Sequence, residues 1–357
     1  MSAKRATIAI ASFSLLICVG VTNAQPPRGG QPPTRRHTAI EKGVLNLVEA
    51  NQKTRYKNQV SIKAMNFSRV IQVNGIPEHQ VGPFPNRGNP HAIKQIRATY
   101  RVTLEPKRNK KSTPLGMGNF GVGLNGVLFD PGAAEFWMGN RSSSWRYEAL
   151  SGAVSLGLDT NHAHVQPDGK YHYHGIPTGL LESLKFEKSK HSPLVGWAAD
   201  GHPIYAIYGY SDYKDANSEV KKMRSSYQLK KGFRPGQNRR DVLYPKGRYD
   251  GTFVNDYEYV EGSGDLDECN GKFTVTPEFP DGTYAYFLTE SWPVIPRSFR
   301  GTPNPTFQKS QGQGRGQMGR QQGRGQQSRG GQQGDRRGPP PKGGGFGPPP
   351  RRGGGGG

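Results

Sequence analysis

The sequence predicts a mainly β fold: a single, antiparallel β-rich domain, sandwich-like, with few short helices and with disordered termini. Short segments in which apolar and polar residues alternate recur between about residues 60 and 290. The chain has 50 glycines and 29 prolines among 357 residues, which favours many turns and little helix. The segments that flank this part, residues 25–39 and 301–357, lack the apolar residues that a core requires.

The N-terminus has the order of a secretory signal peptide. Lys4 and Arg5 precede an uncharged apolar run, residues 6–21, and small residues follow as far as Ala24. We therefore expect residues 1–24 to be a signal peptide that is removed after Ala24. The protein would then be exported to the periplasm, the cell surface or the exterior. The run is shorter than the about 20 residues of a membrane span, so no transmembrane segment should remain after cleavage.

The rest of the chain divides into a folded part and two polar segments. Residues 25–39 are rich in proline and basic residues, residues 40–300 form the expected β-rich domain, and residues 301–357 are mostly Gly, Gln, Arg and Pro. We expect both polar segments to be disordered, because they cannot bury enough apolar surface to offset chain entropy. The C-terminal tail holds ten basic residues and one acid, so it supplies +9 of the formal net charge of +22.

This basic tail indicates an anionic partner. For an exported protein the nearest anions are polymers of the cell envelope or lipid headgroups. Arg-Gly repeats also bind nucleic acid, but we do not expect nucleic acid to be the partner of a protein that leaves the cytoplasm.

Strand signals follow one another through the folded part. The expected strands cover residues 60–64, 69–73, 96–104, 121–129, 195–198, 204–208, 273–276 and 284–289. Turn residues close several of them, such as Asn74-Gly75 after the second strand. Two short helices are expected, over residues 40–50 and 215–223.

The densest chemical signal is residues 161–175, which hold four of the nine histidines. His162 and His164 form one His-x-His pair, and His172 and His174 form another. Side chains alternate between the two faces of a strand, so the members of each pair share a face if their segment is extended.

The turn between the two pairs decides whether they meet. Residues 166–170 match the turn pattern x-Pro-Asp-Gly-x. A three-residue loop, a type I turn closed by a glycine bulge, places His164 opposite His172 and all four imidazoles on one face. A two-residue loop would shift the register and split the cluster. We favour the three-residue loop because proline suits the first corner of a type I turn.

A second Pro-Asp-Gly-x-Tyr-x-Tyr stretch, residues 280–286, offers an internal comparison. It keeps both tyrosines but has Ala285 and Phe287 where the first stretch has His172 and His174. If the two stretches form similar hairpins, the turn does not need the histidines, and another role must account for them.

Metal ligation is the role that suits these histidines. Neutral imidazole binds Zn²⁺ and Cu²⁺, and a hairpin would hold several imidazoles in place. His202, on a turn beside Asp200, would add a ligand from another strand, and Asp200 would orient a ligand. The candidate ligands are His162, His164, His172, His174 and His202. The alternative is that these histidines bond to backbone or tyrosine groups in an ordinary sheet.

One segment, residues 250–268, runs against the net charge with seven acids and no Lys or Arg. Its end, with Asp265, Asp267 and Glu268, has features of a Ca²⁺ loop but does not match the EF-hand spacing. Two interpretations stay open: a Ca²⁺ site, or an acidic loop paired with the protein's own Lys and Arg. Cys269 is the only cysteine left after signal cleavage, so it is a buried small residue, a metal ligand or an intermolecular bridge.

These motifs resemble the YHYH-domain family of bacterial exported proteins, which is named for the tetrapeptide at residues 171–174. The similar pieces are residues 163–175, 196–205, 225–230, 249–253 and 266–271. The resemblance covers about residues 60–300 and implies export. It carries over His164, His172 and His174 as motif residues, but not His162 or His202, and it specifies no activity.

Three classes of function follow. The leading one is an exported protein that binds a transition metal, Zn or Cu, through the histidine hairpin. The second is a structural or adhesive protein of the cell envelope with no metal. The third is a metal-dependent enzyme, for hydrolysis or copper oxidation. We find no Ser-His-Asp spacing, nucleophile elbow, phosphate loop or dinucleotide fingerprint, so no catalytic residue or substrate is named.

Overall fold

The structure is a computed structural model that describes residues 45–238 and 243–309. The expected signal peptide, the basic segment 25–39 and the tail from residue 310 onward lie outside the described residues. The described part is mainly β with little helix, as the sequence predicts.

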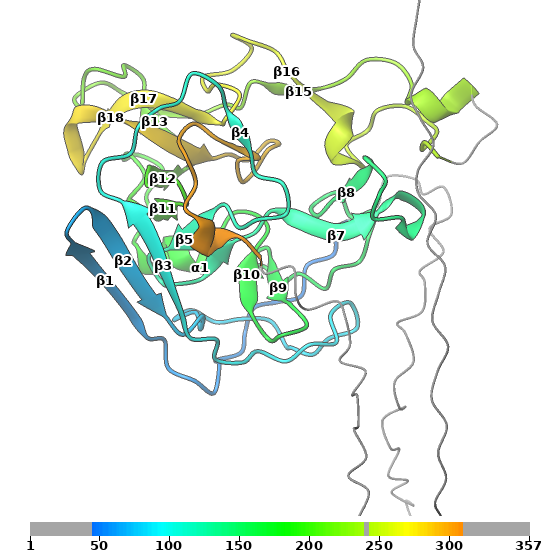
Figure 1. Cartoon of the computed structure of the whole chain (residues 1–357), viewed down its shortest axis with the longest axis horizontal. Helices are drawn as coiled ribbons and strands as arrows, with labels where there is room; N and C mark the ends of the chain where they lie inside the picture. Colours follow the sequence, from blue (N-terminus) through cyan, green and yellow to red (C-terminus); the bar gives the residue numbers. More distant parts are fainter. Residues whose placement is uncertain (1–44, 239–242, 310–357) are drawn as a thin grey trace, which may run out of the picture. The chain divides into compact units, whose positions relative to one another are not determined.

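An eight-stranded sheet forms the centre of this part (Figure 1). Its strand order is β17-β18-β12-β11-β5-β6-β10-β9. The strands are β5 (Gly121–Gly123), β6 (Leu128–Phe129), β9 (Ala163–Val165), β10 (Tyr171–Tyr173), β11 (Gly196–Ala198), β12 (Pro203–Ala206), β17 (Gly271–Thr276) and β18 (Phe279–Leu288). The pairs β6–β10 and β12–β18 are parallel, and the other neighbours are antiparallel.

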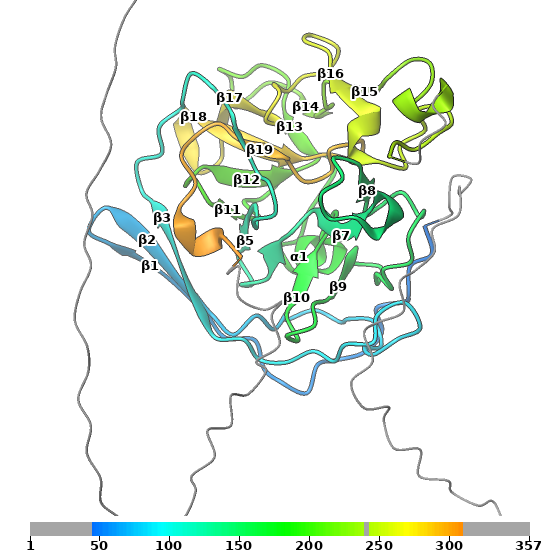
Figure 2. The same cartoon turned by 45° about the vertical axis from the view of Figure 1, so that its right-hand side comes forward.

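A three-stranded antiparallel sheet packs beside the large sheet (Figure 2). It consists of β1 (Val60–Met65), β2 (Ser68–Val73) and β3 (Ala98–Thr103). Ile71 and Val102 from this sheet and Phe120 and Phe129 from the large sheet region belong to one buried cluster. The two sheets therefore share a core, which agrees with a sandwich-like arrangement.

Shorter elements surround these sheets. Four two-stranded pairs join β4 (Thr113–Pro114) to β19 (Ser298–Phe299), β7 (Gly132–Phe136) to β8 (Arg146–Glu148), β13 (Tyr208–Tyr210) to β14 (Val220–Lys222), and β15 (Tyr227–Leu229) to β16 (Tyr257–Tyr259). The helical elements are α1 (Thr178–Ser183) and the 3-10 turns η1 (Trp137–Gly139), η2 (Pro235–Asn238), η3 (Val254–Asp256) and η4 (Pro305–Phe307). Within the described residues, no helix has the length and apolar character needed to cross a membrane.

The two predicted helices are not formed where the structure describes them. Residues 45–50 of the first are not helical, and Val48 bridges Asp159 in parallel. In the second, the Asp215 carboxylate accepts a hydrogen bond from the Asn217 backbone at 2.8 Å, which favours a turn. The later residues of that segment form β14, which pairs with β13. Pairing with distant partners overrides the weak helical pattern in both places.

The strand predicted over residues 121–129 is two strands, β5 and β6, joined by a tight turn. Asn125 and Gly126 lie in this turn, and Gly126 has φ +79°. The glycine takes a left-handed conformation that other residues adopt at a cost, which explains the reversal of the chain.

The second Pro-Asp-Gly stretch is not a hairpin turn, so the expectation of two similar hairpins is wrong. Residues 277–278 form the turn between β17 and β18, where the Thr276 hydroxyl accepts a hydrogen bond from the Phe279 backbone at 3.1 Å. Residues 280–282 lie inside β18 at a shift in register, and Gly282 has φ +88°. Pro-Asp-Gly therefore forms a bulge here, because the chain has already reversed.

The fold also extends beyond the boundary expected at residue 300. The buried Phe307 ring lies 4.8 Å from the Tyr100 ring, and its carbonyl accepts a hydrogen bond from Asn119 Nδ2 at 3.0 Å. Because the tail has almost no other apolar residue, its composition does not indicate that Phe307 is buried in the fold.

Candidate metal centre

The histidine hairpin has the predicted three-residue loop. β9 and β10 pair with His164 opposite His172. The Gly169 backbone N–H donates to the Gln166 carbonyl at 2.8 Å, and the Gln166 N–H donates to the Lys170 carbonyl at 2.9 Å. Gly169 has φ +96°, the left-handed conformation that closes such a loop.

The opposite face of the hairpin is structural. Tyr171 and Tyr173 are fully buried there. The Tyr171 hydroxyl donates to Asp159 Oδ2 at 2.7 Å, and the Tyr173 oxygen accepts a hydrogen bond from Asn125 Nδ2 at 2.9 Å. These bonds fix the hairpin in the core, so the histidines on the other face are held by a rigid support.

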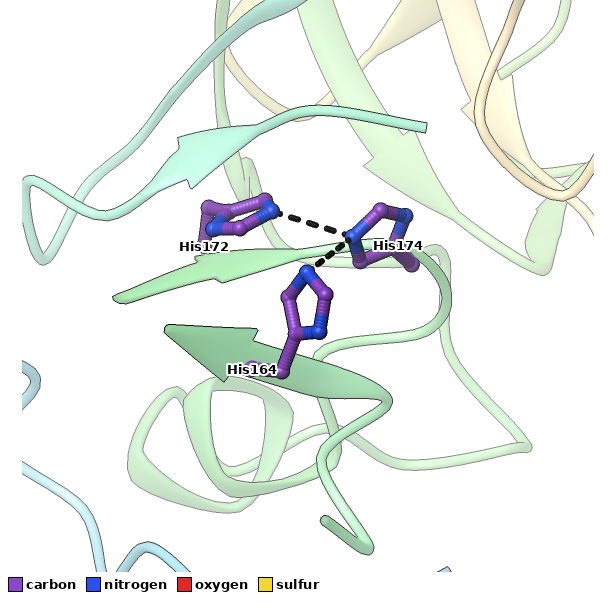
Figure 3. Close-up of side chains that lie close together, drawn as sticks. All are labelled: His164, His172 and His174. Carbon is purple, nitrogen blue, oxygen red and sulfur yellow. Dashed lines mark hydrogen bonds between the residues drawn. The ribbon is translucent and has the colours of Figure 1, made fainter. Parts of the chain in front are cut away.

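Three histidines converge on one point (Figure 3). The His174 Nε2 atom lies 3.1 Å from His164 Nε2 and 3.0 Å from His172 Nε2. The candidate ligand atoms of all three lie within 4.8 Å of one another. The side chain of His172 is 2% exposed and His174 is 1% exposed, while His164 is partly exposed.

Backbone carbonyls fix the tautomers of two of these rings. His164 Nδ1 lies 2.7 Å from the Leu156 carbonyl, and His172 Nδ1 lies 3.2 Å from the Lys170 carbonyl. A carbonyl only accepts, so each Nδ1 carries the hydrogen and each Nε2 presents a lone pair. Asn89 Nδ2 also lies 3.2 Å from His164 Nδ1, but the shorter carbonyl contact decides that tautomer.

The two fixed lone pairs both point at the His174 Nε2 atom. A neutral His174 ring can donate at most one proton from this nitrogen, so at least one of the two short N···N contacts has no proton in it. A cation between the three nitrogens satisfies all of them. Zinc–nitrogen bonds of about 2.0–2.1 Å in a tetrahedral site separate ligand nitrogens by roughly 3.3 Å, close to the two observed contacts.

The surroundings keep the three rings neutral. The pKa of His164 is lowered to about 3, chiefly by burial and then by the neighbouring His172. The pKa of His172 is also lowered to about 3, chiefly by burial and then by the ammonium of Lys309. Burial and the two neighbouring imidazoles hold the pKa of His174 well below its ordinary value. Neutral imidazole is the form that binds a metal, so no proton has to leave first near neutral pH.

His162 does not join the cluster, so the prediction of four imidazoles on one face is wrong. Its backbone has φ +54°, which breaks the alternation of an extended strand. Its Nδ1 atom lies 2.9 Å from the Ile176 carbonyl instead. The N–H of His174 still donates to the His162 carbonyl at 2.7 Å, so the two residues face each other only through their backbones.

His202 and Asp200 also lie away from the three histidines. The buried His202 ring packs 5.0 Å from the Tyr284 ring. Asp200 Oδ2 accepts hydrogen bonds from the Tyr286 hydroxyl at 2.5 Å and from the Gly301 N–H at 2.8 Å. Asp200 therefore holds the C-terminal part of the fold and does not orient a hairpin histidine.

The acidic segment is paired with the protein's own cations. Asp265 lies 2.7 Å from Lys221 Nζ, while Asp267 and Glu268 each lie 2.7 Å from Arg300 Nη2. These contacts agree with the acidic-loop interpretation rather than with a Ca²⁺ site. Cys269 is a buried free thiol, and burial raises its pKa to about 12, so it behaves as a small apolar residue.

A fourth group, Asp130, lies beside the cluster, and no sequence motif points to it. β6 runs parallel to β10, and the Asp130 N–H donates to the Tyr173 carbonyl at 2.8 Å. This pairing brings Asp130 Oδ2 to 3.9 Å from His172 Nε2. Only the pairing of strands that are distant in sequence reveals this neighbour.

Fold and site together describe a β-rich protein with a buried cluster of three histidines. Residues 99–301 match the model of the family described as YHYH protein. The chain therefore belongs to the YHYH family, as its motifs predict. No curated protein and no solved structure matches the chain.

Proposed function

We propose that this is an exported protein that binds a transition metal, Zn or Cu, through His164, His172 and His174. The single observation that carries the proposal is the convergence of their Nε2 atoms, 3.0 and 3.1 Å apart, with two tautomers set by carbonyls. Preformed ligands lose little conformational entropy on binding, which favours affinity. Three imidazole ligands leave one position of a four-coordinate ion for a further donor.

The decisive experiment is elemental analysis of the mature protein, purified without an affinity tag, beside two variants. His172→Ala with His174→Phe removes two ligands and installs the residues found in β18 at Ala285 and Phe287, which are fully buried there. His162→Asn is the matched control on the same hairpin, since asparagine tolerates its positive φ. We expect the double variant to lose the metal and the control to keep it.

A chelator separates ligation from packing. If the histidines are ligands, chelation should lower the stability of the wild type and leave the double variant unchanged. If they are packing groups, the double variant should lose about 1–3 kcal/mol through unpaired buried partners, and chelator should do nothing to the wild type. A folded double variant with full metal content would end the proposal.

Export is the second half of the proposal. It is supported by the signal-like order of residues 1–24 and by the family. The exported protein should begin at Gln25 on N-terminal sequencing, and a chain that begins at Met1 would contradict it. The tail is proposed to contact anionic envelope polymers or lipid headgroups, which binding to anionic and neutral vesicles with and without residues 310–357 would test.

A metal-dependent enzyme is the second candidate. Four buried polar atoms with no hydrogen-bond partner favour it: Asp130 Oδ1, Glu135 Oε2, Arg146 Nη2 and Arg297 Nε. Asp130 lies 3.9 Å from His172 and Arg297 acts electrostatically on His174, while Asp130, Glu135 and Arg297 all act electrostatically on Arg146. Arginine side chains of this kind bind carboxylate or phosphate groups. Metal-dependent turnover of simple carboxylic or phosphate esters, lost in the double variant, would support this candidate.

A further inference from the structure

The two carboxylate oxygens of Asp130, which lies near the histidines, differ in their hydrogen bonding. Its side chain is 1% exposed. Its Oδ2 atom accepts from Gln166 Nε2 at 2.9 Å and lies 2.5 Å from Lys309 Nζ. Its Oδ1 atom is buried and has no hydrogen-bond partner. Burying a carboxylate oxygen without a hydrogen-bond partner costs free energy of folding, so we expect this oxygen to bind a ligand.

The unpartnered oxygen belongs to the carboxylate that neighbours the metal ligands. Asp130 Oδ2 lies 3.9 Å from His172 Nε2, about half an ångström beyond the roughly 3.3 Å between two ligands on a tetrahedral ion. A small rotation of the side chain covers this difference. Carboxylate oxygen is an ordinary fourth ligand for zinc beside imidazole nitrogens.

We propose that Asp130 is the fourth protein group of the metal centre and that Lys309 competes with the metal for it. This inference rests on the proposed metal site at His164, His172 and His174. In this structure Lys309 holds the carboxylate, and three histidines gather without it. Binding of the ion draws Asp130 to the metal, and the ammonium of Lys309 withdraws.

The charges of the site support this exchange. Three neutral imidazoles leave a divalent ion uncompensated, and Asp130 supplies one negative charge. Lys309 and Arg297 both act electrostatically on His174, and either cation opposes a second cation nearby. Lys309 is 33% exposed, so its ammonium can move into water, whereas Asp130 is enclosed. Moving the Lys309 ammonium away from the carboxylate therefore costs less free energy than moving Asp130 away from the site.

The resulting donor set also selects the class of metal. Three imidazole nitrogens and one carboxylate oxygen suit a divalent ion such as Zn²⁺. They do not suit Cu⁺, which prefers thiolate and thioether sulfur. Asp130 therefore narrows the proposed ion to a divalent one.

The test uses Co²⁺ as the probe on the full mature chain, with affinity measured by chelator competition and coordination by visible absorption. Asp130→Asn should weaken Co²⁺ binding about 10–100-fold and change the absorption spectrum. Lys309→Met should tighten binding about tenfold, and most of this gain should disappear once Asp130→Asn is present, which leaves only the loss of direct repulsion between Lys309 and the ion. Lys190→Met, at an exposed lysine paired with Glu187, is the control for the loss of one charge.

Each outcome decides the matter. Wild type that binds no Co²⁺ and contains no metal overturns the proposed function together with this inference. Wild type that binds Co²⁺, with Asp130→Asn unchanged in affinity and spectrum, overturns the inference alone. If Asp130→Asn does not fold, Lys309→Met decides: tightening beyond that of Lys190→Met supports the exchange, and equal affinity overturns it.

Discussion

Backbone conformation at single residues decides which histidines form the site. His164 and His172 lie in paired strands, and their rings meet because period-two alternation holds there. His162 lies one step outside β9, and its φ of +54° turns its ring to the Ile176 carbonyl. The sequence predicted that His164 and His172 meet, but no residue near His162 indicates its positive φ.

His191 is a buried histidine outside the metal centre, and it makes stability depend on pH. Its ring packs 5.0 Å from Tyr205 and 4.6 Å from Tyr210, and Glu278 is the charged group that acts on it. Burial lowers its pKa below the ordinary 6.5. The unfolded chain therefore binds a proton first, so this contribution is complete above about pH 6.5 and is lost as pH falls toward the folded pKa.

His191→Phe should therefore flatten the pH dependence of stability. We expect the free energy of unfolding, measured in urea with chelator present, to fall less between pH 7.5 and pH 5.5 than it does in the wild type. One histidine contributes at most about 1.4 kcal/mol per pH unit. Phenylalanine fits among the same aromatic rings but cannot make the 2.8 Å hydrogen bond between His191 Nδ1 and the Ser192 carbonyl, so the difference at pH 8 reports packing together with that bond. An unchanged slope would mean that His191 does not titrate on unfolding.

At the scale of elements, the same tripeptide has two outcomes. Pro-Asp-Gly at residues 167–169 reverses the chain, whereas at residues 280–282 it forms a bulge inside β18. In both places the glycine takes a positive φ, so local chemistry is preserved. The reversal differs because the Thr276 hydroxyl closes an earlier turn. The tripeptide thus specifies the glycine conformation, and the residues around it decide whether that conformation closes a hairpin turn or forms a bulge.

These two glycines provide a matched pair of variants. A Cβ at Gly169 would lie 2.6 Å from the Lys94 side chain, and one at Gly282 would lie 2.6 Å from the Phe273 ring. Both have a positive φ, so we expect Gly169→Ala and Gly282→Ala each to cost about 1–3 kcal/mol of stability. Only Gly169→Ala should also weaken metal binding, because it loosens the register of the histidine hairpin.

Chelator competition checks this pair, with urea unfolding as the measure of stability. Metal affinity that stays at the wild-type value in both variants would show that the loop does not set the ligand geometry. A loss of affinity in Gly282→Ala as large as that in Gly169→Ala would point to a global effect of destabilisation.

At the scale of the whole molecule, the sequence predicted the fold class, most strands and the hairpin register, and three of the five histidines that it singled out lie together in the structure. What it could not supply came from long-range pairing. Asp130 reaches His172 only because β6 runs parallel to β10. The segment expected as a helix near residue 48 is drawn into a bridge with Asp159. Such contacts depend on the closure of long loops, which no local pattern encodes.

The C-terminal boundary of the fold gives the last prediction. Composition places it at residue 300, but Phe307 is buried against Tyr100, and its carbonyl accepts from Asn119. The Gly301 N–H also donates to the buried Asp200 carboxylate. A chain that ends at Lys309 should therefore unfold like the full chain, since it keeps all three contacts.

A chain that ends at residue 300 should lose about 3–5 kcal/mol, the usual cost of removing a buried aromatic side chain, with unpaired Asn119 and Asp200 adding to it. Urea unfolding of the two truncations with chelator present measures the difference without the metal's contribution. The two chains differ by nine residues that contain a single large apolar side chain, Phe307. Equal midpoints would place the boundary at residue 300, where composition alone predicts it.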